Sequence, residues 1–273
     1  MIKISGSDIT SGSMGFHYMV GSVQRTTLDK LSLSSVVYKY ATLDQLKFEL
    51  DLRANIVDAA IELGKSKFAF RTFRKSMCNA DYWERTDEGG FLLKNGIKPS
   101  DAIRDIYNNS IKYGTECATA IVIIYYKALV GIFSEKQFND LFQGIYLMNW
   151  GYLDSDLGIR HYQSVSDILP GDCRYFKNPD VNPLTPEWQG ENAIDLSKGM
   201  YYGHGIGIRN AEGIIEALNR RRKSDAKESA YLMGSATRLG FKRLADIYYG
   251  TSMRRLDVDG TIDRKHLRCC NFL

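Results

Sequence analysis

Residues 115–126 are the stretch from which the fold is best read, Thr115-Glu116-Cys117-Ala118-Thr119-Ala120-Ile121-Val122-Ile123-Ile124-Tyr125-Tyr126. A cysteine stands at the start of a long apolar segment, and small residues follow it at once, so the backbone there can pack tightly. The β-branched residues of the segment favour a buried strand. Its length, which continues to about Phe133, favours a helix instead. We therefore predict a helix that begins near Cys117.

In such a helix, the free N–H groups of the first turn and the positive end of the helix dipole lie close to Cys117. Both favour the thiolate over the thiol, and a thiolate is a nucleophile near neutral pH. The alternative is that Cys117 serves as a small buried hydrophobic residue, as cysteines beside apolar runs commonly do. A base within reach of the sulfur would favour the first interpretation.

The composition indicates a globular chain without nucleic-acid or membrane partners. It has 273 residues, of which 44% are hydrophobic and 25% charged, and its net charge of +4 is too small to indicate nucleic acid. No secretory signal and no bilayer-spanning run is visible, which predicts cytoplasmic synthesis. The five cysteines, at 78, 117, 173, 269 and 270, are an irregular set typical of reduced thiols. They lack zinc-ligand spacing, so we expect no metal and no cofactor.

Local patterns predict most of the remaining elements. Thr42 and Gln45 form a capping box before apolar residues at helical spacing, which predicts a helix over 43–63 that Gly64 ends. Further helices are expected over 100–112, 138–150, 211–223, 224–239 and 241–249. Strands are expected over 172–176, 192–196 and 200–208, and the last two read as a hairpin joined at 197–199. Residues 1–249 read as one catalytic domain, whose first 39 residues form an irregular arm, and residues 250–273 read as a charged tail.

A cysteine nucleophile needs a base, and the base needs an orienting acceptor. The four histidines are His17, His161, His204 and His266. His17 falls in the expected arm, His266 in the expected tail, and His161 in a loop. His204 lies between two glycines on the second hairpin strand, where its imidazole is approachable. A histidine that is only hydrogen-bonded within its strand is the alternative.

The hairpin also supplies a carboxylate. If Ser197 faces Met200 across a two-residue turn, Glu191 and His204 lie on one face of the sheet as diagonal neighbours, about 7–8 Å apart. Glu191 can then hold the imidazole as the third catalytic group. A shift of the register by one residue would remove this relation. A solvated strand end is the alternative for Glu191.

Six stretches resemble the spore-coat protein-glutamine γ-glutamyltransferases of endospore-forming bacteria. They are residues 52–57 (LRANIV), 102–106 (AIRDI), 116–126 (ECATAIVIIYY), 171–179 (GDCRYFKNP), 188–192 (WQGEN) and 204–208 (HGIGI). They follow the family's order and span about residues 40–245. The Gly-Asp before an aromatic strand, followed by His-Gly-Ile-Gly-Ile, more distantly resembles the NlpC/P60 branch of papain-like folds. The resemblance implies an α+β fold in which the helix bearing the nucleophile packs on a mainly antiparallel sheet.

The resemblance implies a calcium-independent transglutaminase, with Cys117 as nucleophile, His204 as base and Glu191 as supporting carboxylate. Glu116 would assist Glu191 or partly replace it. The family also implies a tunnel for the donor and acceptor side chains, lined by Trp150, Trp188 and Phe70, with core packing as the alternative role of these rings. The implied partners are glutamine- and lysine-bearing spore coat proteins, and the enzyme is expected to be a monomer in the spore coat.

Two rival functions remain open on the sequence. A thiol hydrolase of the NlpC/P60 type, a peptidase or amidase, would use the same three catalytic residues. A non-catalytic coat protein would use the fold only to bind. The two ends of the chain, before residue 40 and after Gly250, depart from the family pattern. The pair Cys269 and Cys270 in the tail reads as an incidental pair of exposed thiols, with crosslinking in the coat as the alternative.

Overall fold

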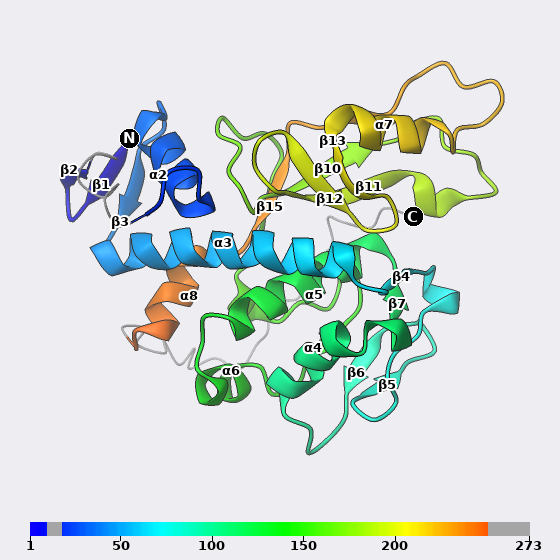
Figure 1. Ribbon diagram of the computed structural model, residues 1–273, viewed down its shortest axis with the longest axis horizontal. Coiled ribbons are helices and arrows are strands. Elements are labelled where there is room, and N and C mark those ends of the chain that lie inside the picture. The colour runs from blue at the N-terminus through cyan, green and yellow to red at the C-terminus, as the bar shows by residue number, and fades with distance from the viewer. Residues whose placement is uncertain (10–17, 251–273) are drawn as a thin grey trace, which may run out of the picture.

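Helix α3 (Leu43–Lys65) crosses the middle of the computed structural model, which describes residues 1–9 and 18–250 (Figure 1). Its start confirms the predicted cap: the Thr42 side chain accepts from the Gln45 N–H at 3.1 Å, and the Gln45 side chain accepts from the Ala41 N–H at 2.9 Å. The predicted end is wrong, because Gly64 lies within the last turn. A Cβ at Gly64 would come 2.9 Å from a ring carbon of Tyr202. The glycine therefore lets α3 approach the sheet closely.

Helix α5 (Cys117–Val130) begins where the sequence predicted. All residues from Ala118 to Tyr126 are buried, together with Ala128 and Leu129. A helix that is apolar on every side must be enclosed by other elements. Helix α5 is enclosed by α3, by α4 (Pro99–Asn108) and by strand β11 (Gly190–Asp195).

Seven strands form the main sheet, in the spatial order β13, β12, β11, β10, β15 and β9, with β14 also paired to β10. Every pair in it is antiparallel. Besides β11, the strands are β9 (Arg160–Tyr162), β10 (Cys173–Lys177), β12 (Met200–Gly203), β13 (Gly207–Asn210), β14 (Tyr231–Leu232) and β15 (Ala236–Arg238). Strands β10 and β11 confirm two of the predicted strands. With α5 packed against β11, the sheet confirms the predicted α+β class.

The two faces of this sheet are covered by different helices. Helix α7 (Ala211–Asn219) lies on one face, and α3 and α5 lie on the other (Figure 1). Successive side chains of a strand point to opposite faces. Accordingly Ala193 belongs to the core under α7, whereas Ile194 belongs to the core formed with α5.

The hairpin loop differs from the prediction in a way that changes the site. The Leu196 N–H donates to the Met200 carbonyl at 2.8 Å, so the loop has three residues, 197–199, instead of two. All three have positive φ, at 75°, 52° and 73°. Ala193 therefore pairs with Gly203, one residue away from the predicted register. The predicted placing of Glu191 and His204 on one face is wrong, because an odd shift exchanges the faces. The prediction that His204 lies on a strand is also wrong, because the strand expected over 200–208 is interrupted by a turn at 204–206 between β12 and β13.

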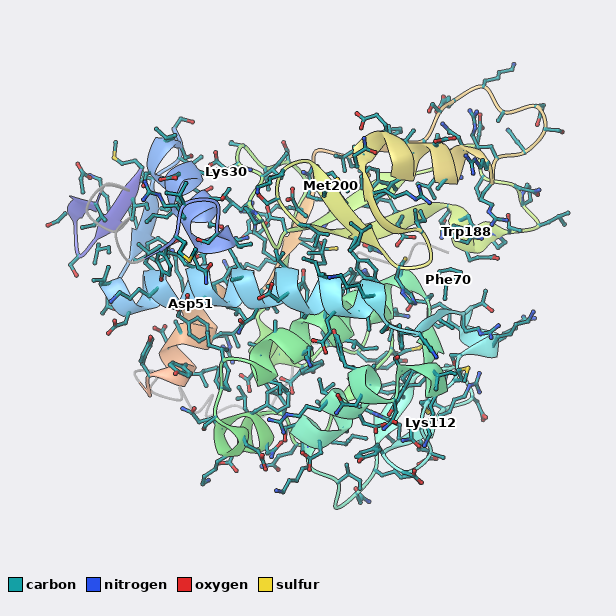
Figure 2. The ribbon with its side chains drawn as sticks, in the orientation of Figure 1. Lys30, Asp51, Phe70, Lys112, Trp188 and Met200 are labelled. Atoms are coloured by element: carbon teal, nitrogen blue, oxygen red, sulfur yellow. The ribbon has the colours of Figure 1, made fainter. Side chains whose placement is uncertain are left out.

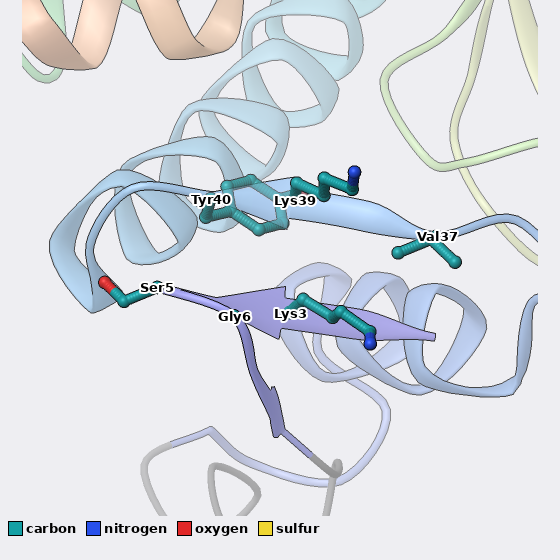
Figure 3. A pocket seen from close by; sticks show the side chains of 6 residues that line it. All are labelled: Lys3, Ser5, Gly6, Val37, Lys39 and Tyr40. Carbon is teal, nitrogen blue, oxygen red and sulfur yellow. The ribbon is translucent and has the colours of Figure 1, made fainter.

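The predicted irregular arm over residues 1–39 is also wrong. Strands β1 (Ile2–Ile4), β2 (Ser7–Ile9) and β3 (Tyr38–Tyr40) form a small sheet in the order β2-β1-β3, and helix α2 (Val23–Leu33) lies beside it (Figure 1). Their own core includes Ile2, Leu28 and Leu46, so it continues onto α3. Lys3 and Lys39 are neighbours on parallel strands beside a hollow of about 480 Å³ (Figure 3). Strands of three residues are too short for alternation to be recognised in the sequence.

Other boundaries also differ from the predictions. Helix α4 begins with Pro99 and ends at Asn108, and a 3₁₀ turn at Ser110–Lys112 follows, so Ser100 is not its cap. Helix α6 (Glu135–Leu141) replaces the start of the helix predicted over 138–150, and β8 (Tyr146–Leu147) follows it. Strands β14 and β15 stand where a helix was predicted over 224–239. Helix α8 (Phe241–Tyr248) is confirmed.

The remaining elements lie around the start of α5. Strand β6 (Phe91–Leu93) lies between β5 (Trp83–Arg85) and β8 and pairs with both, and β4 (Ala69–Phe70) runs parallel to β7 (Gly114–Thr115). The other 3₁₀ turns are Phe73–Lys75, Ser155–Leu157 and Pro186–Trp188. Among the described residues, none of the helices has the length and apolar character needed to span a membrane. His17, His266 and the pair Cys269 and Cys270 lie outside the described residues, as does the tail from 251 onward.

Candidate active site

Glu116 caps the helix that carries Cys117. Its carboxylate accepts hydrogen bonds from the N–H groups of Ala118 and Thr119, the latter at 2.8 Å, and from the Thr119 hydroxyl. The Thr119 hydroxyl in turn accepts from the Asn149 N–H at 2.8 Å. A carboxylate at this position occupies the donors of the first turn and offsets the positive end of the helix dipole. Burial raises the pKa of Glu116, and these bonds partly oppose that rise.

The Cys117 side chain is only partly covered, and two carboxyl groups, Glu191 and Glu116, act on it electrostatically. Burial raises the pKa of the thiol well above its usual range, and the charges of Glu191 and Glu116 raise it further. The predicted preference for the thiolate in the resting protein is therefore wrong. The sequence argument counted the helix dipole but not the two carboxylates that oppose it. The thiol needs a nearby proton acceptor before it can attack.

Glu191 is the candidate for that acceptor, because its charge raises the pKa of the Cys117 thiol more than the charge of Glu116 does. It is 1% exposed, and burial together with the charge of Glu116 raises its pKa well above the usual range. The backbone N–H of His204 donates to its carboxylate, and its Oε1 is buried without a hydrogen-bond partner. A Cβ at Gly203 would come 2.9 Å from Glu191 Cγ. The glycine before His204 therefore leaves the room that the Glu191 side chain fills.

The imidazole of His204 does not make the predicted contacts. Its Nδ1 lies 2.9 Å from the Tyr202 hydroxyl, and its Nε2 lies 3.2 Å from the Ala69 carbonyl oxygen. Because a carbonyl only accepts, Nε2 carries the proton, and Nδ1 accepts from the Tyr202 hydroxyl. Burial lowers the pKa of His204 to about 4. Within residues 1–9 and 18–250, no hydrogen bond joins this ring to Cys117 or to Glu191, so the predicted imidazole–carboxylate contact is wrong.

Two of the three predicted substrate-binding rings meet beside His204. Phe70 from β4 and Trp188 stack with their ring centres 4.9 Å apart and 29° between their planes (Figure 2). They come from distant parts of the chain, Phe70 from β4 and Trp188 from the turn before β11, and lie side by side at the right of Figure 2. Gly205 has φ +95°, and a Cβ there would come 2.7 Å from the Phe70 ring. The turn that carries His204 therefore also fits against this stack.

The third ring, Trp150, makes no ring contact with that stack among the described residues. It is partly buried against the core of α5, next to Asn149, whose N–H bonds to Thr119 in the first turn of α5. The structure thus brings Cys117, Glu116 and Glu191 together, with the His204 backbone against Glu191. The His204 ring and the Phe70–Trp188 stack lie beside these groups. Trp150 lies near the start of α5.

Sequence reasoning missed two residues that contact this site. Asn192 donates from its side-chain amide to Cys117 Sγ at 3.4 Å, and Tyr202 holds the His204 ring. With the correct register, the sequence would have placed Asn192 opposite His204 and identified it as a candidate. Among the described residues, no three His, Cys, Asp or Glu side chains are grouped so as to hold a metal ion.

A cysteine at the start of a buried helix, beside a buried carboxyl group and against an antiparallel sheet, defines a site for thiol-dependent acyl transfer. Comparison with known proteins agrees. A family model described as protein-glutamine gamma-glutamyltransferase matches residues 1–248. A protein-glutamine gamma-glutamyltransferase of Bacillus mycoides (strain KBAB4) is 52% identical over 209 residues, which are 77% of this chain and 75% of the relative.

Two further comparisons point the same way. A protein-glutamine gamma-glutamyltransferase of Bacillus cereus (strain B4264) is 51% identical over 222 residues, which are 81% of this chain and 79% of the relative. A solved structure, transglutaminase from Geobacillus stearothermophilus without its C-terminal extension, superposes with a TM-score of 0.72 at 50% identity, covering 76% of this chain and 98% of that chain. The chain belongs to the protein-glutamine gamma-glutamyltransferase family. Its activity is that of an acyltransferase of the transglutaminase type, and the predicted family and enzyme class are confirmed.

Proposed function

We propose that the enzyme crosslinks glutamine and lysine side chains of spore coat proteins through a thioester on Cys117, with Glu191 as the proton acceptor. The observation that carries this assignment is the buried, unpartnered Oε1 of Glu191, which belongs to the carboxylate with the largest electrostatic effect on the Cys117 thiol. His204 positions Glu191 through its backbone N–H instead of acting as the base. The Bacillus sources of the relatives support a role in the spore coat.

The first half-reaction moves one proton and forms one bond. The Cys117 S–H proton passes to Glu191, and the sulfur attacks the γ-carboxamide carbon of a glutamine side chain. The C–N bond then breaks, the departing nitrogen takes the proton from Glu191, and ammonia leaves. A thioester remains on Cys117. Burial raises the pKa of Glu191, which makes its carboxylate a stronger base toward the thiol proton.

The second half-reaction returns the enzyme to its starting state. A neutral lysine amine attacks the thioester carbon and gives a proton to Glu191, and the C–S bond breaks. The sulfur recovers the proton, and the isopeptide is released. Lysine is mostly protonated in water, and an apolar passage favours its neutral form. We propose that Phe70, Trp188 and Trp150 line that passage and limit the access of water, which would otherwise hydrolyse the thioester.

The test is incorporation of a biotinylated alkylamine into a glutamine-rich protein such as casein, with and without a calcium chelator. We expect incorporation that the chelator leaves unchanged, and none for Cys117→Ala. Cys78→Ala is the matched control, because Cys78 is a partly covered cysteine outside the site. Incorporation by Cys117→Ala would refute the nucleophile. Release of ammonia with no amine incorporated would favour a thiol hydrolase.

The spore coat assignment needs its own experiment. Coats are isolated from spores that lack the enzyme, incubated with wild-type protein or with Cys117→Ala, and digested for mass spectrometry. We expect ε-(γ-glutamyl)lysine-linked peptides from coat proteins only with the wild-type protein. If casein is crosslinked and coat proteins are not, the substrate assignment is wrong although the chemistry is correct.

A further inference from the structure

One residue of strand β11 directs two N–H groups at the Cys117 sulfur. The side-chain amide of Asn192 donates to Sγ at 3.4 Å, and the backbone N–H of Asn192 bonds to the same sulfur. Hydrogen bonds to sulfur are longer than those to oxygen. A hydrogen bond becomes stronger when its acceptor carries a charge. Both donors lower the pKa of the thiol, against burial and the charges of Glu191 and Glu116, which raise it.

The backbone N–H groups of Asn192 and His204 are free to bond elsewhere because the pairing of β11 with β12 ends just before them. Strand β11 pairs with β12 as far as Ala193 and Gly203, and the ladder stops there. In the same register the next pair would be Asn192 and His204. At that position the Asn192 N–H bonds to Cys117, and the His204 N–H bonds to the Glu191 carboxylate. Two backbone donors that would be consumed in a longer hairpin thus serve the sulfur and its proton acceptor.

A second cysteine sets the orientation of the Asn192 amide. Asn192 pairs with Tyr175 across β10, so Cys173 lies on the same face of the sheet. The Cys173 thiol lies 3.9 Å from Asn192 Oδ1 and 3.8 Å from the carbonyl oxygen of Arg174. When the single thiol proton is directed at the amide oxygen, the NH₂ group faces Cys117. Cys173 is 2% exposed, so water does not compete for this contact.

We propose that Asn192 is a catalytic residue whose backbone and side-chain N–H groups hold the negative charge on the Cys117 sulfur once the proton has moved to Glu191. In this step the S–H bond breaks, an O–H bond forms on the carboxylate, and the electron pair stays on sulfur. The two N–H groups face that pair without moving, so they stabilise the thiolate more than the thiol. The proposal rests on the assignment of Cys117 as the nucleophile.

The test measures the pH dependence of Cys117 alkylation by iodoacetamide, followed by mass spectrometry of the peptide that contains Cys117. Replacing the side-chain donor in Asn192→Ala should move the midpoint of alkylation up by about one pH unit, since the thiolate loses a charge-assisted bond. Asn192→Asp should move it further, because a carboxylate repels the thiolate. Removing the orienting thiol in Cys173→Ala should give a smaller shift in the same direction.

Asn178→Ala is the matched control. Asn178 is a buried asparagine just after β10, and its amide donates only to the backbone carbonyls of Trp188 and Leu218. We expect it to lower the melting temperature without moving the midpoint. A folded Asn192→Ala protein with the wild-type midpoint would overturn the proposal. Should Asn192→Ala fail to fold, Asn192→Ser decides the matter by the same criterion.

Alkylation requires neither a glutamine nor an amine substrate, so this experiment is independent of the transfer reaction. If the wild-type protein incorporates no amine, the proposed function fails while the role of Asn192 can still be judged from the midpoints. If amine is incorporated and the midpoints coincide, the proposed function stands and the role of Asn192 is refuted.

Discussion

Two buried carboxylates at opposite ends of the β10–β11 pair have opposite environments. Asp172 stands just before β10 and is 0% exposed, and it binds two guanidinium groups, Arg53 at 2.9 Å and Arg238 at 2.6 Å. Burial alone would raise the pKa of Asp172, but Arg53 and Arg238 hold it below the usual range. Glu191 is equally buried, no cation lowers its pKa, and burial together with the charge of Glu116 raises it.

The comparison separates a structural carboxylate from a reactive one. The Asp172 cluster also holds Glu49, which accepts from Arg53 at 2.9 Å and from the Tyr40 hydroxyl at 2.9 Å, so it ties the N-terminal sheet to α3 and to β10. Its charges are all paired. Glu191 keeps a buried oxygen without a hydrogen-bond partner, and its pKa is raised. A buried carboxylate without a cation is costly to the fold and is therefore a candidate for function.

The largest expected effect is on catalysis and concerns Glu191, the buried carboxylate that has no guanidinium partner. Glu191→Gln keeps the shape but removes proton acceptance, so amine incorporation should fall by about 10²–10⁴-fold. The melting temperature should stay the same or rise, since a buried charge is removed. Initial rates and a thermal melt of the same preparation test both parts. A wild-type rate in Glu191→Gln and in the Glu116→Gln/Glu191→Gln double variant would exclude both carboxylates from the mechanism.

The second prediction concerns the stability that the ion pairs of Asp172 provide. Arg53→Met leaves Asp172 and Glu49 buried without their main partner, which should lower the free energy of unfolding by about 3–5 kcal/mol. In a chain of this size, that lowers the melting temperature by roughly 10 °C. Activity at a temperature where the variant stays folded should remain near wild type. Lys98→Met, which breaks an exposed pair with Glu135, is the control and should change little.

The third prediction tests the room that Glu191 occupies. In Gly203→Ala the new Cβ would meet Glu191 Cγ at 2.9 Å, so the carboxylate must move. We expect a loss of roughly 10- to 100-fold in amine incorporation. Gly144→Ala is the control, because a Cβ there has no atom within 4 Å. Equal rates for the two variants would show that the position of Glu191 is not critical.

The smallest expected effect is a pH dependence of stability from His204. Its folded pKa of about 4 lies below its unfolded value near 6.5, so the unfolded chain binds the proton more readily between these values. The His204 contribution is therefore fully present above about pH 6.5 and is lost as the pH falls toward 4. The raised pKa values of Glu191 and Glu116 act in the opposite direction.

The measurement compares urea unfolding at pH 7 and pH 5 for the wild-type protein and for His204→Gln. The variant should lose less stability on acidification, since glutamine does not titrate. An identical pH dependence in the two proteins would mean that the buried imidazole does not contribute to it.

Local patterns were sufficient for the elements that carry strong periodicity or length. The capping box at Thr42 and Gln45 predicted the start of α3, and the long apolar run after Cys117 predicted α5. The three-residue strands β1, β2 and β3 gave no comparable signal. The ends of α3 and α4 were also misjudged, because Gly64 serves close packing and Pro99 takes the first helical position.

The sequence by itself determined the family, the α+β class and the identity of the chemical groups, because these depend on residue types in long, specific motifs. The tertiary structure alone decided which groups meet. The loop between β11 and β12 has three left-handed residues instead of the two predicted, which shifts the pairing of these strands by one residue. As a result the His204 ring points away from Glu191, and the His204 backbone N–H contacts the Glu191 carboxylate instead. Whether a buried carboxylate finds a guanidinium, as Asp172 does, or keeps an oxygen without a partner, as Glu191 does, depends on contacts between distant segments. Local propensity carries no information about such contacts.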